Sequence, residues 1–330
     1  MINFRFHLVS LVAVFLALTI GIVVGASVVN QQIVDGLNRR INTVENNADK
    51  QRSENQLLRG KVKELQSYLE TAAPYMVEGR LTAVPVPVIA EQGIDRDAVH
   101  ALVTLLHDAG AQTPAIVWLQ PKWALEKPDD RAELAAIVDG DAASSGLRVQ
   151  ALTVLADRLG TEVSVAASGG GSGSGSSTTT TVKSAPPSDV LTALTTAGFV
   201  SIEAIGASGT TDLSTFPQAG ARVVLVSGEA SDLPPQVFLS LAKELSAHAV
   251  PTVAAEVYEP TNGQPPRGAV VKPIRDNSAL YESVSTVDDL DIVPGQVAAV
   301  LAVAELGEGK VGHYGYGSGA DQALPAWSGP

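Results

Sequence analysis

The chain has 330 residues, of which 45% are apolar, 17% charged and 5% aromatic, so it is long and apolar enough to bury one or two hydrophobic cores. Its formal net charge of −13 argues against a nucleic-acid partner, which would require a basic face to neutralise phosphates. It contains no cysteine, which excludes disulfides, thiolate catalysis, iron–sulfur clusters and zinc sites with thiolate ligands.

The first element is the uncharged stretch from Leu8 to Val29, LVSLVAVFLALTIGIVVGASVV. A helix of this length measures ~33 Å, enough to cross the hydrocarbon core of a bilayer. The alternative is a cleaved secretory signal, with Arg5 in its basic region and a small-residue cleavage site ending at Ala26. The apolar run exceeds the usual signal core of about 7–15 residues, and helix-compatible sequence continues past it. We therefore predict a cytoplasmic head and a transmembrane anchor over residues 1–29.

The orientation of this anchor is predicted from the short head that precedes it. Arg5 on one side is balanced by Arg39 and Arg40 on the other, so the positive-inside bias is weak. A head with no foldable mass favours the cytoplasmic side. We expect a single-pass protein of the cell membrane with its domain outside the cytoplasm, and with outer-envelope association left open.

The next segment carries a heptad pattern, with apolar residues spaced alternately by three and four. These residues are Val34, Leu37, Ile41, Val44, Ala48, Leu58, Val62, Leu65, Leu69, Ala72 and Met76. Gln51 and Asn55 occupy a d and an a position, where buried polar groups fix register and helix number. Because the flanks are polar, this narrow seam favours a partner helix over a monomeric helix lying on its own domain. We predict a coiled-coil stalk over residues 30–78 that forms a parallel homodimer.

Residues 79–330 alternate between predicted strands and helices. A strand from Val84 to Ala90, a helix from Asp95 to Ala109 and a strand from Ala115 to Leu119 form a strand–helix–strand unit, which indicates a parallel sheet. Further helices are predicted over 133–139, 147–159, 189–197 and 235–248, and further strands over 199–204, 222–226 and 252–257. We predict one extracytoplasmic Rossmann-like α/β domain with a parallel sheet and helices on both faces, in which Trp118 and Trp123 pack in the core or at its rim.

A low-complexity segment interrupts this domain. Residues 168–181 contain only glycine, serine and threonine, which cannot bury enough apolar surface to stay ordered. We predict a disordered loop over residues 168–187.

The C-terminal region is a polar stretch, a predicted apolar helix from Val297 to Leu306 and a glycine-rich segment. The sequence STVDDLDIVPGQVAAVLAVAELGEGKVGHYG resembles the C-terminal signature of the actinobacterial MctB family of copper transporters of the cell envelope. The opening FRFHLVSLVAVFLALTIGIVVG is similar to that family's N-terminal anchor. The resemblance implies a role in copper efflux, copper homeostasis or channel formation. The family includes SteB-type cell-separation proteins, so the alternative is a non-catalytic scaffold or regulator of envelope assembly and cell division that acts through an envelope protein partner.

The side chains of this sequence give little support to copper binding, which the resemblance implies. Copper(I) prefers thiolate or thioether ligands and copper(II) prefers clustered imidazoles, whereas the chain has two methionines and five scattered histidines. His100 and His107 share a predicted helix face but lie two turns, ~10 Å, apart, and we assign them to a solvated face. His313 is a weak candidate metal ligand, and the alternative is a capping or packing histidine.

Other motifs do not indicate catalysis. The glycines within residues 307–312 imitate a phosphate-binding loop but follow a helix instead of preceding one. Asp288, Asp289 and Asp291 form the densest carboxylate cluster, which we interpret as helix capping ahead of Pro294. No serine lies in a nucleophile elbow. We predict that the chain is not an enzyme, has no resident cofactor and handles copper only as a transported ion.

Overall fold

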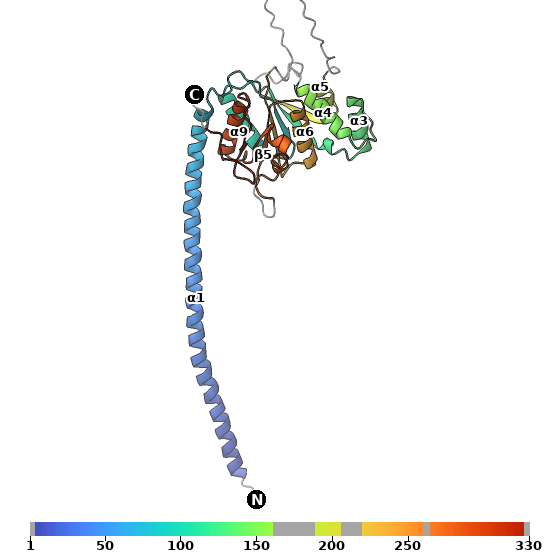
Figure 1. The fold of residues 1–330 in the computed structure, drawn as a ribbon. Helices are drawn as coiled ribbons and strands as arrows, with labels where there is room; N and C mark the ends of the chain where they lie inside the picture. The colour runs from blue at the N-terminus through green and yellow to red at the C-terminus, as the bar shows by residue number, and fades with distance from the viewer. Residues whose placement is uncertain (1–3, 161–188, 206–219, 260–264, 327–330) are drawn as a thin grey trace, which may run out of the picture. The chain divides into compact units, whose positions relative to one another are not determined.

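The computed structural model describes residues 4–160, 189–205, 220–259 and 265–326 (Figure 1). The chain divides into two compact units, Met1–Ser67 and Tyr68–Pro330. The described part of the first unit is entirely helical, and the second unit contains the sheet. The predicted Gly/Ser/Thr loop at 168–187 lies outside the described residues.

Helix α1, Phe4–Val77, begins with the apolar segment of the sequence. Its first part, Phe4–Ala26, is 23 residues long and apolar enough to cross a membrane. Leucine, alanine and the absence of proline up to Pro74 explain the unbroken helix, because few residues here disfavour the helical backbone. One apolar helix near the N-terminus is confirmed, and its apolar span lies slightly earlier than the predicted Leu8 to Val29.

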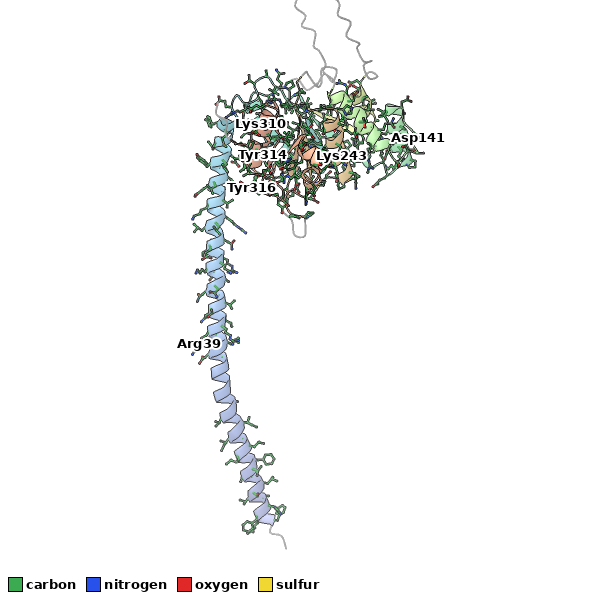
Figure 2. The ribbon with its side chains drawn as sticks, in the orientation of Figure 1. Arg39, Asp141, Lys243, Lys310, Tyr314 and Tyr316 are labelled. Carbon is green, nitrogen blue, oxygen red and sulfur yellow. The ribbon has the colours of Figure 1, made fainter. Side chains whose placement is uncertain are left out.

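The heptad part of α1 within the first unit exposes its apolar side chains. The large residues of the predicted seam are between 44% and 67% exposed, namely Val34, Leu37, Ile41, Val44, Leu58, Val62 and Leu65. Figure 2 shows side chains of this helix, Arg39 among them, projecting outward from a single rod. Among its described side chains, the first unit therefore carries an exposed apolar stripe and no buried apolar cluster.

The last turns of α1 belong to the second unit and pack into it. Ala73 and Val77 are buried in the same apolar cluster as the sheet. The helix runs through Pro74 and ends at Val77. Packing of the residues on either side of Pro74 offsets the lost backbone hydrogen bond. Gly79, with a φ of 73°, then turns the chain.

The second unit is built on a seven-stranded sheet with the order β3-β2-β1-β4-β5-β6-β7. The strands are β1 (Val88–Glu91), β2 (Ala115–Leu119), β3 (Val200–Ala204), β4 (Val223–Gly228), β5 (Thr252–Val257), β6 (Val284–Val287) and β7 (His313–Tyr314). All neighbours are parallel except β2 and β3. The strand order reverses between β1 and β4, which is the position where open α/β sheets form a crevice.

Helices cover both faces of the sheet, as the sequence predicted (Figure 1). The end of α1, α2 (Arg96–Asp108) and α9 (Val293–Leu306) pack on one face. The other face carries α3 (Pro128–Val138), α4 (Leu147–Gly160), α5 (Val190–Thr196), α6 (Pro235–Ala247), α7 (Lys272–Arg275) and α8 (Ser278–Tyr281), while η1 (Pro121–Ala124) follows β2. Trp118 and Trp123 are buried in opposite layers, so of the two alternatives, core or rim packing, both residues lie in the core.

The predicted parallel sheet is confirmed for all neighbouring strands except β3, which pairs antiparallel with β2. Helix α5 returns the chain to the carboxyl end of β2, where the amide of Gln120 donates to the carbonyl of Phe199. The strand that starts there, Val200 opposite Leu119, must run back along β2 and is antiparallel. The described sheet is therefore mostly parallel, with one antiparallel edge strand, an arrangement common in large α/β sheets.

Two other boundaries differ from the sequence prediction for local reasons. Strand β1 begins at Val88 instead of Val84, because Pro85 and Pro87 cannot donate to a neighbouring strand. Helix α9 begins at Val293, with proline in its first turn, where no intrahelical donor is required. The short elements α7, α8, β6 and β7 were not predicted, because segments of two to four residues show no periodicity.

Candidate functional site

Polar side chains follow four neighbouring parallel strands at their carboxyl ends. Glu91 ends β1, Ser227 and Glu256 pair in register near the ends of β4 and β5, and Asp288 comes directly after β6. The residues that precede them are themselves in register across the sheet, namely Ala90, Val226, Ala255 and Val287. The four polar residues thus form one row, called here the carboxyl-edge row. Ligands of open α/β sheets bind beyond this edge, so the row is where the fold positions chemistry.

Glu256 holds the loop that leads into α7. Its carboxylate accepts backbone N–H groups from Gly268 and Val270, both at 2.9 Å, and from Val271 at 3.2 Å. Burial raises the pKa of Glu256 to about 7, although these three donors oppose the shift, and the neighbouring Asp288 adds to it. Its carboxyl group is satisfied by backbone donors, which makes it a structural clamp on this loop.

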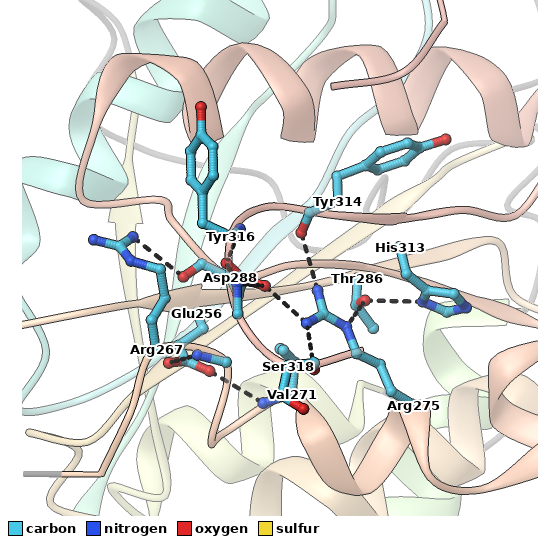
Figure 3. A network of polar contacts seen from close by, with 12 residues as sticks. Glu256, Arg267, Val271, Arg275, Thr286, Asp288, His313, Tyr314, Tyr316 and Ser318 are labelled. Carbon is cyan, nitrogen blue, oxygen red and sulfur yellow. Dashed lines mark hydrogen bonds and ion pairs between the residues drawn. The ribbon is translucent and has the colours of Figure 1, made fainter. Parts of the chain in front are cut away.

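Asp288 forms a fully buried ion pair with Arg275, at 2.7 Å and with side chains 0% and 2% exposed (Figure 3). Asp288 also accepts the backbone N–H groups of Tyr316 and Gly317 at 2.8 and 3.0 Å. Arg275 donates from Nη2 to the carbonyl of Tyr314 at 2.9 Å. The pair therefore connects β6, α7 and the C-terminal loop. Removing one partner of such a buried pair destabilises the fold, because the other charge is left buried without compensation.

The C-terminal loop approaches Asp288 too closely for a side chain at Gly315. Gly315 has a φ of 123°, and a Cβ there would overlap the carboxylate of Asp288. Glycine tolerates both the backbone conformation and the contact. The glycine-rich C-terminal segment thus packs closely around a buried carboxylate. It follows a helix, as the sequence indicated.

The other two aspartates of the cluster lie beside Asp288 and do not cap α9. Asp291 accepts a bidentate pair from Arg267 at 2.8 and 3.1 Å. Neither carboxylate oxygen of Asp289 has a hydrogen-bond partner among the described residues. Burial, reinforced by Asp288, raises the pKa of Asp289 to about 7. The N-cap of α9 is Ile292, with no side-chain cap bond, so the capping interpretation is wrong.

Glu91 lies at the other end of the carboxyl-edge row, against a crevice of about 450 Å³. Its Oε2 accepts hydrogen bonds from the hydroxyls of Ser227 at 2.5 Å and Ser231 at 2.7 Å. Burial raises the pKa of Glu91, and the two hydroxyl donors oppose that shift. The crevice lies at the reversal of strand order between β1 and β4, the usual place for a ligand in this fold class.

His313, the candidate metal ligand, is buried in β7 with both ring nitrogens in hydrogen bonds. The carbonyl of Tyr281 can only accept, so His313 Nε2 donates to it at 3.0 Å. In the neutral ring Nδ1 is then the acceptor, so the Thr286 hydroxyl donates to Nδ1 at 2.9 Å while its oxygen accepts from Arg275 Nε at 2.8 Å (Figure 3). Burial lowers the pKa of His313, in agreement with this neutral tautomer. The ring packs against Tyr281, with centroids 3.9 Å apart.

Comparison with known proteins places this architecture in a family. A family model described as "Copper transport outer membrane protein, MctB" matches residues 1–325. The chain belongs to the MctB family. "Copper transporter MctB" of Mycobacterium tuberculosis (strain ATCC 25618 / H37Rv) is 26% identical over 321 residues, which cover 97% of this chain and 98% of that protein. "Copper transporter MctB" of Mycobacterium leprae (strain TN) is 24% identical over the same shares. The resemblance seen at the two ends of the sequence is confirmed over nearly the whole chain.

MctB family membership and the apolar span Phe4–Ala26 together identify a membrane protein. The family and these relatives are named as transporters, which agrees with the prediction that the chain is not an enzyme. Within residues 4–160, 189–205, 220–259 and 265–326, no group of three or more His, Cys, Asp or Glu side chains is placed to hold a metal ion. In the described residues, the MctB fold therefore presents buried charge networks instead of a metal-binding cluster.

The remaining residues singled out from the sequence lie on exposed surfaces. His100 and His107 are exposed on α2, as predicted, and His100 Nε2 lies 2.7 Å from a carboxylate oxygen of Glu203. Gln51 and Asn55 are exposed on α1, and Asn55 Nδ2 donates to the carbonyl of Gln51 at 3.0 Å. Within the second unit, neither His100 nor His107 is grouped with His313 in a metal-binding cluster of the described residues.

Sequence reasoning missed Glu91, Glu256 and Arg275, which carry much of the site. A signal was present for the two glutamates, because each comes at or near the end of a short apolar strand, in VIAE and TVAAEV. In a parallel sheet such ends meet at one edge. Nothing in the sequence pointed to Arg275. An arginine is usually expected at the surface, and the buried partner of Arg275 lies in another element.

Proposed function

We propose that this MctB-family chain is a single-pass, membrane-anchored protein that takes part in moving copper across the cell envelope. The observation that carries the proposal is the family match over residues 1–325, which includes the apolar span Phe4–Ala26 as well as the sheet domain. The relatives named as copper transporters match almost end to end, at 97% of this chain and 98% of theirs. The anchor and the domain are therefore retained together in proteins with that name.

The domain is proposed to lie outside the cytoplasm. The second unit, Tyr68–Pro330, is a compact body that follows the apolar span in the sequence. Arg5 on one side against Arg39 and Arg40 on the other gives only a weak positive-inside bias. Fusing a reporter that is active only in the cytoplasm to each end would test this topology, and activity at the C-terminal end would contradict it.

The exposed stripe of α1 supports a parallel homodimer through a coiled coil. Its apolar a and d positions are solvent-exposed in a single chain, and a second copy in register would cover them. Asn55 at an a position and Gln51 at a d position would set the register. Because the chain has no cysteine, Val62→Cys introduces a single thiol that meets its own copy in a parallel dimer.

That thiol gives a direct test in membranes. We expect Val62→Cys to form a disulfide-linked dimer under mild oxidation, since equivalent a positions lie close across a parallel pair. Ser67→Cys, at an f position on the opposite side of the helix, serves as the matched control and should remain monomeric. Equal cross-linking of the two variants, or none by either, would contradict the coiled coil.

The proposed role in copper transport does not depend on a soft copper site in the described part of the domain. Copper(I) prefers thiolate or thioether ligands, and the chain has no cysteine and two methionines. The two ring nitrogens of His313 are occupied by Thr286 and Tyr281. One helix cannot line a conduit, so a pathway requires several spans from copies of this chain or from an envelope partner. We infer a non-catalytic role in which the anchor assembles the pathway and the domain recruits or positions partners.

Copper content of cells tests this function. Cells lacking the gene should accumulate copper in copper-supplemented medium, and the full-length chain should restore the lower level. His313→Gln should restore it as well, because that side chain serves packing. A chain truncated after residue 78 and an anchorless chain should both fail.

Two outcomes would overturn the transport proposal. Unchanged copper content in the deleted strain, together with a defect in cell separation, would support the scaffold alternative. Loss of copper control in His313→Gln, with the protein folded and present at the normal level, would assign copper binding to that histidine.

A further inference from the structure

The crevice beside Glu91 has the position and size of a small-molecule site that the transport proposal does not use. It has a volume of about 450 Å³, which lies within the range of ordinary ligand pockets. Its lining comes from the ends of β1 and β4, the start of α6 and the loop before α7. These elements meet where the strand order reverses, so the fold itself opens the crevice.

Glu91, one of the residues that line this crevice, has a hydrogen-bond acceptor without a partner among the described residues. The side chain is 1% exposed, and Oε2 is occupied by the hydroxyls of Ser227 and Ser231. Oε1 is buried and has no hydrogen-bond partner among the described residues. A buried acceptor of this kind is costly unless a donor satisfies it, and a bound ligand can provide that donor.

The rest of the lining decides the charge of the ligand. Glu229 is a second carboxylate at the crevice, and none of the described lining residues is Lys, Arg or His. Helix α6 has Pro234 as its N-cap and Pro235 as its first residue, and neither proline has an N–H group to offer a phosphate. The crevice therefore repels anions, and a cation would compensate the buried carboxylate of Glu91.

The apolar part of the lining decides the rest of the ligand. Leu233, Phe238, Leu239, Val270 and Pro273 form most of the wall around the carboxylate. We propose that this crevice binds a small organic ammonium ion, whose N–H group donates to Oε1 of Glu91 and whose apolar portion packs against Phe238 and Leu239. The hydroxyls of Ser227 and Ser231 hold the carboxylate in place for that contact.

Calorimetry on the full-length chain in lipid nanodiscs tests the proposal with three probes of nearly equal shape. Phenethylammonium is the cation, phenethyl alcohol the neutral analogue and phenylpropionate the anion, and empty nanodiscs correct for partitioning into lipid. We expect phenethylammonium to bind at least about tenfold more tightly than either analogue, because only the cation compensates Glu91.

Matched variants locate the contact. Glu91→Gln should weaken phenethylammonium binding by about tenfold or more, whereas Glu229→Gln, with the same change in charge at an exposed position, should change it by no more than about twofold. If Glu91→Gln fails to fold, methyl-labelled leucine spectra of the unmodified chain still locate the probe, because Leu233 and Leu239 should shift on binding. Equal affinity for the alcohol or the anion, no binding of phenethylammonium, unchanged binding by folded Glu91→Gln, or shifts confined to other leucines would each overturn the proposal.

Discussion

The two units of this protein place polarity in opposite ways. In Met1–Ser67, the large apolar side chains that the structure describes, such as Phe4, Leu37 and Leu65, are exposed along a single helix. In Tyr68–Pro330, charged side chains such as Asp288, Arg275 and Glu256 are buried beside the sheet. The first unit thus exposes what most proteins bury, and the second buries what most expose.

This contrast shows where each unit obtains its stability. An exposed apolar helix gains little from its own contacts, so its partners are a bilayer and, as we propose, a second copy. A domain with charges inside must satisfy them internally, and its stability then depends on a few ion pairs and backbone donors. Substitutions should therefore affect the free energy of unfolding strongly in the second unit and weakly in the first.

The largest effect is expected from Arg275→Met. This substitution leaves Asp288 buried without its cation and should lower the free energy of unfolding by about 3–5 kcal/mol. Denaturant titration of the full-length chain in detergent measures this, because the buried Trp118 and Trp123 report on the second unit. Lys272→Met on the same short helix is the control, since its pair with Asp276 is exposed and contributes only about 0.3–0.5 kcal/mol. Similar losses in the free energy of unfolding for both variants would show that the buried pair contributes no more to stability than the exposed pair.

A second large effect concerns pH and has the unusual sign. The pKa of Asp289 is raised from 3.8 to about 7, so between these values the folded chain holds a proton that the unfolded chain has lost. The contribution of Asp289 is therefore present below about pH 4 and is lost as pH rises toward 7. The full loss is up to about 4 kcal/mol, because one pKa unit corresponds to about 1.4 kcal/mol.

Asp289→Asn isolates this contribution from the other carboxylates. We expect the variant to be more stable than the native chain at pH 8 and nearly equal to it at pH 4, as measured by denaturant titration at each pH. A difference that is constant with pH would show that Asp289 keeps an ordinary pKa.

An intermediate effect is expected where the glycine loop wraps Asp288. Gly315→Ala places a Cβ against the carboxylate at a φ of 123° and should cost about 2–3 kcal/mol. Gly309→Ala is the matched control, with a φ of 72° but open space around the new Cβ, and should cost about 1 kcal/mol. If the two variants unfold at the same denaturant concentration, the close packing on Asp288 does not contribute to stability.

The architecture was largely predictable because it is encoded in local periodicity. In several elements the apolar pattern extends over more residues than the helix- or strand-breaking residues that flank it. Examples are the helix that ends at Val77 and the strands Ala115–Leu119 and Thr252–Val257. The direction of β3 was not predictable, because an apolar strand has the same pattern whether it runs parallel or antiparallel to its neighbour.

The candidate site was less predictable, because it depends on which elements become neighbours. Asp288, Asp289 and Asp291 look like helix caps in the sequence, since a proline and a helix follow them. In the fold, Arg275 and Arg267 come from an earlier segment to meet two of these carboxylates. Those long-range pairs leave no trace in the spacing of residues along the chain.

The smallest effect on unfolding is expected from the exposed stripe of the first unit. Leu58→Asn combined with Val62→Asn replaces two apolar seam residues that are 58% and 53% exposed. Both lie outside the second unit, so its denaturation midpoint should change by less than about 0.5 kcal/mol in free energy. Association of the full-length chain, measured by light scattering in detergent, should nevertheless be lost, because polar groups at a and d positions remove the apolar contact between helices. A shift of the midpoint without loss of association would reverse the contrast between the two units, since the stripe would then belong to the fold of a single chain.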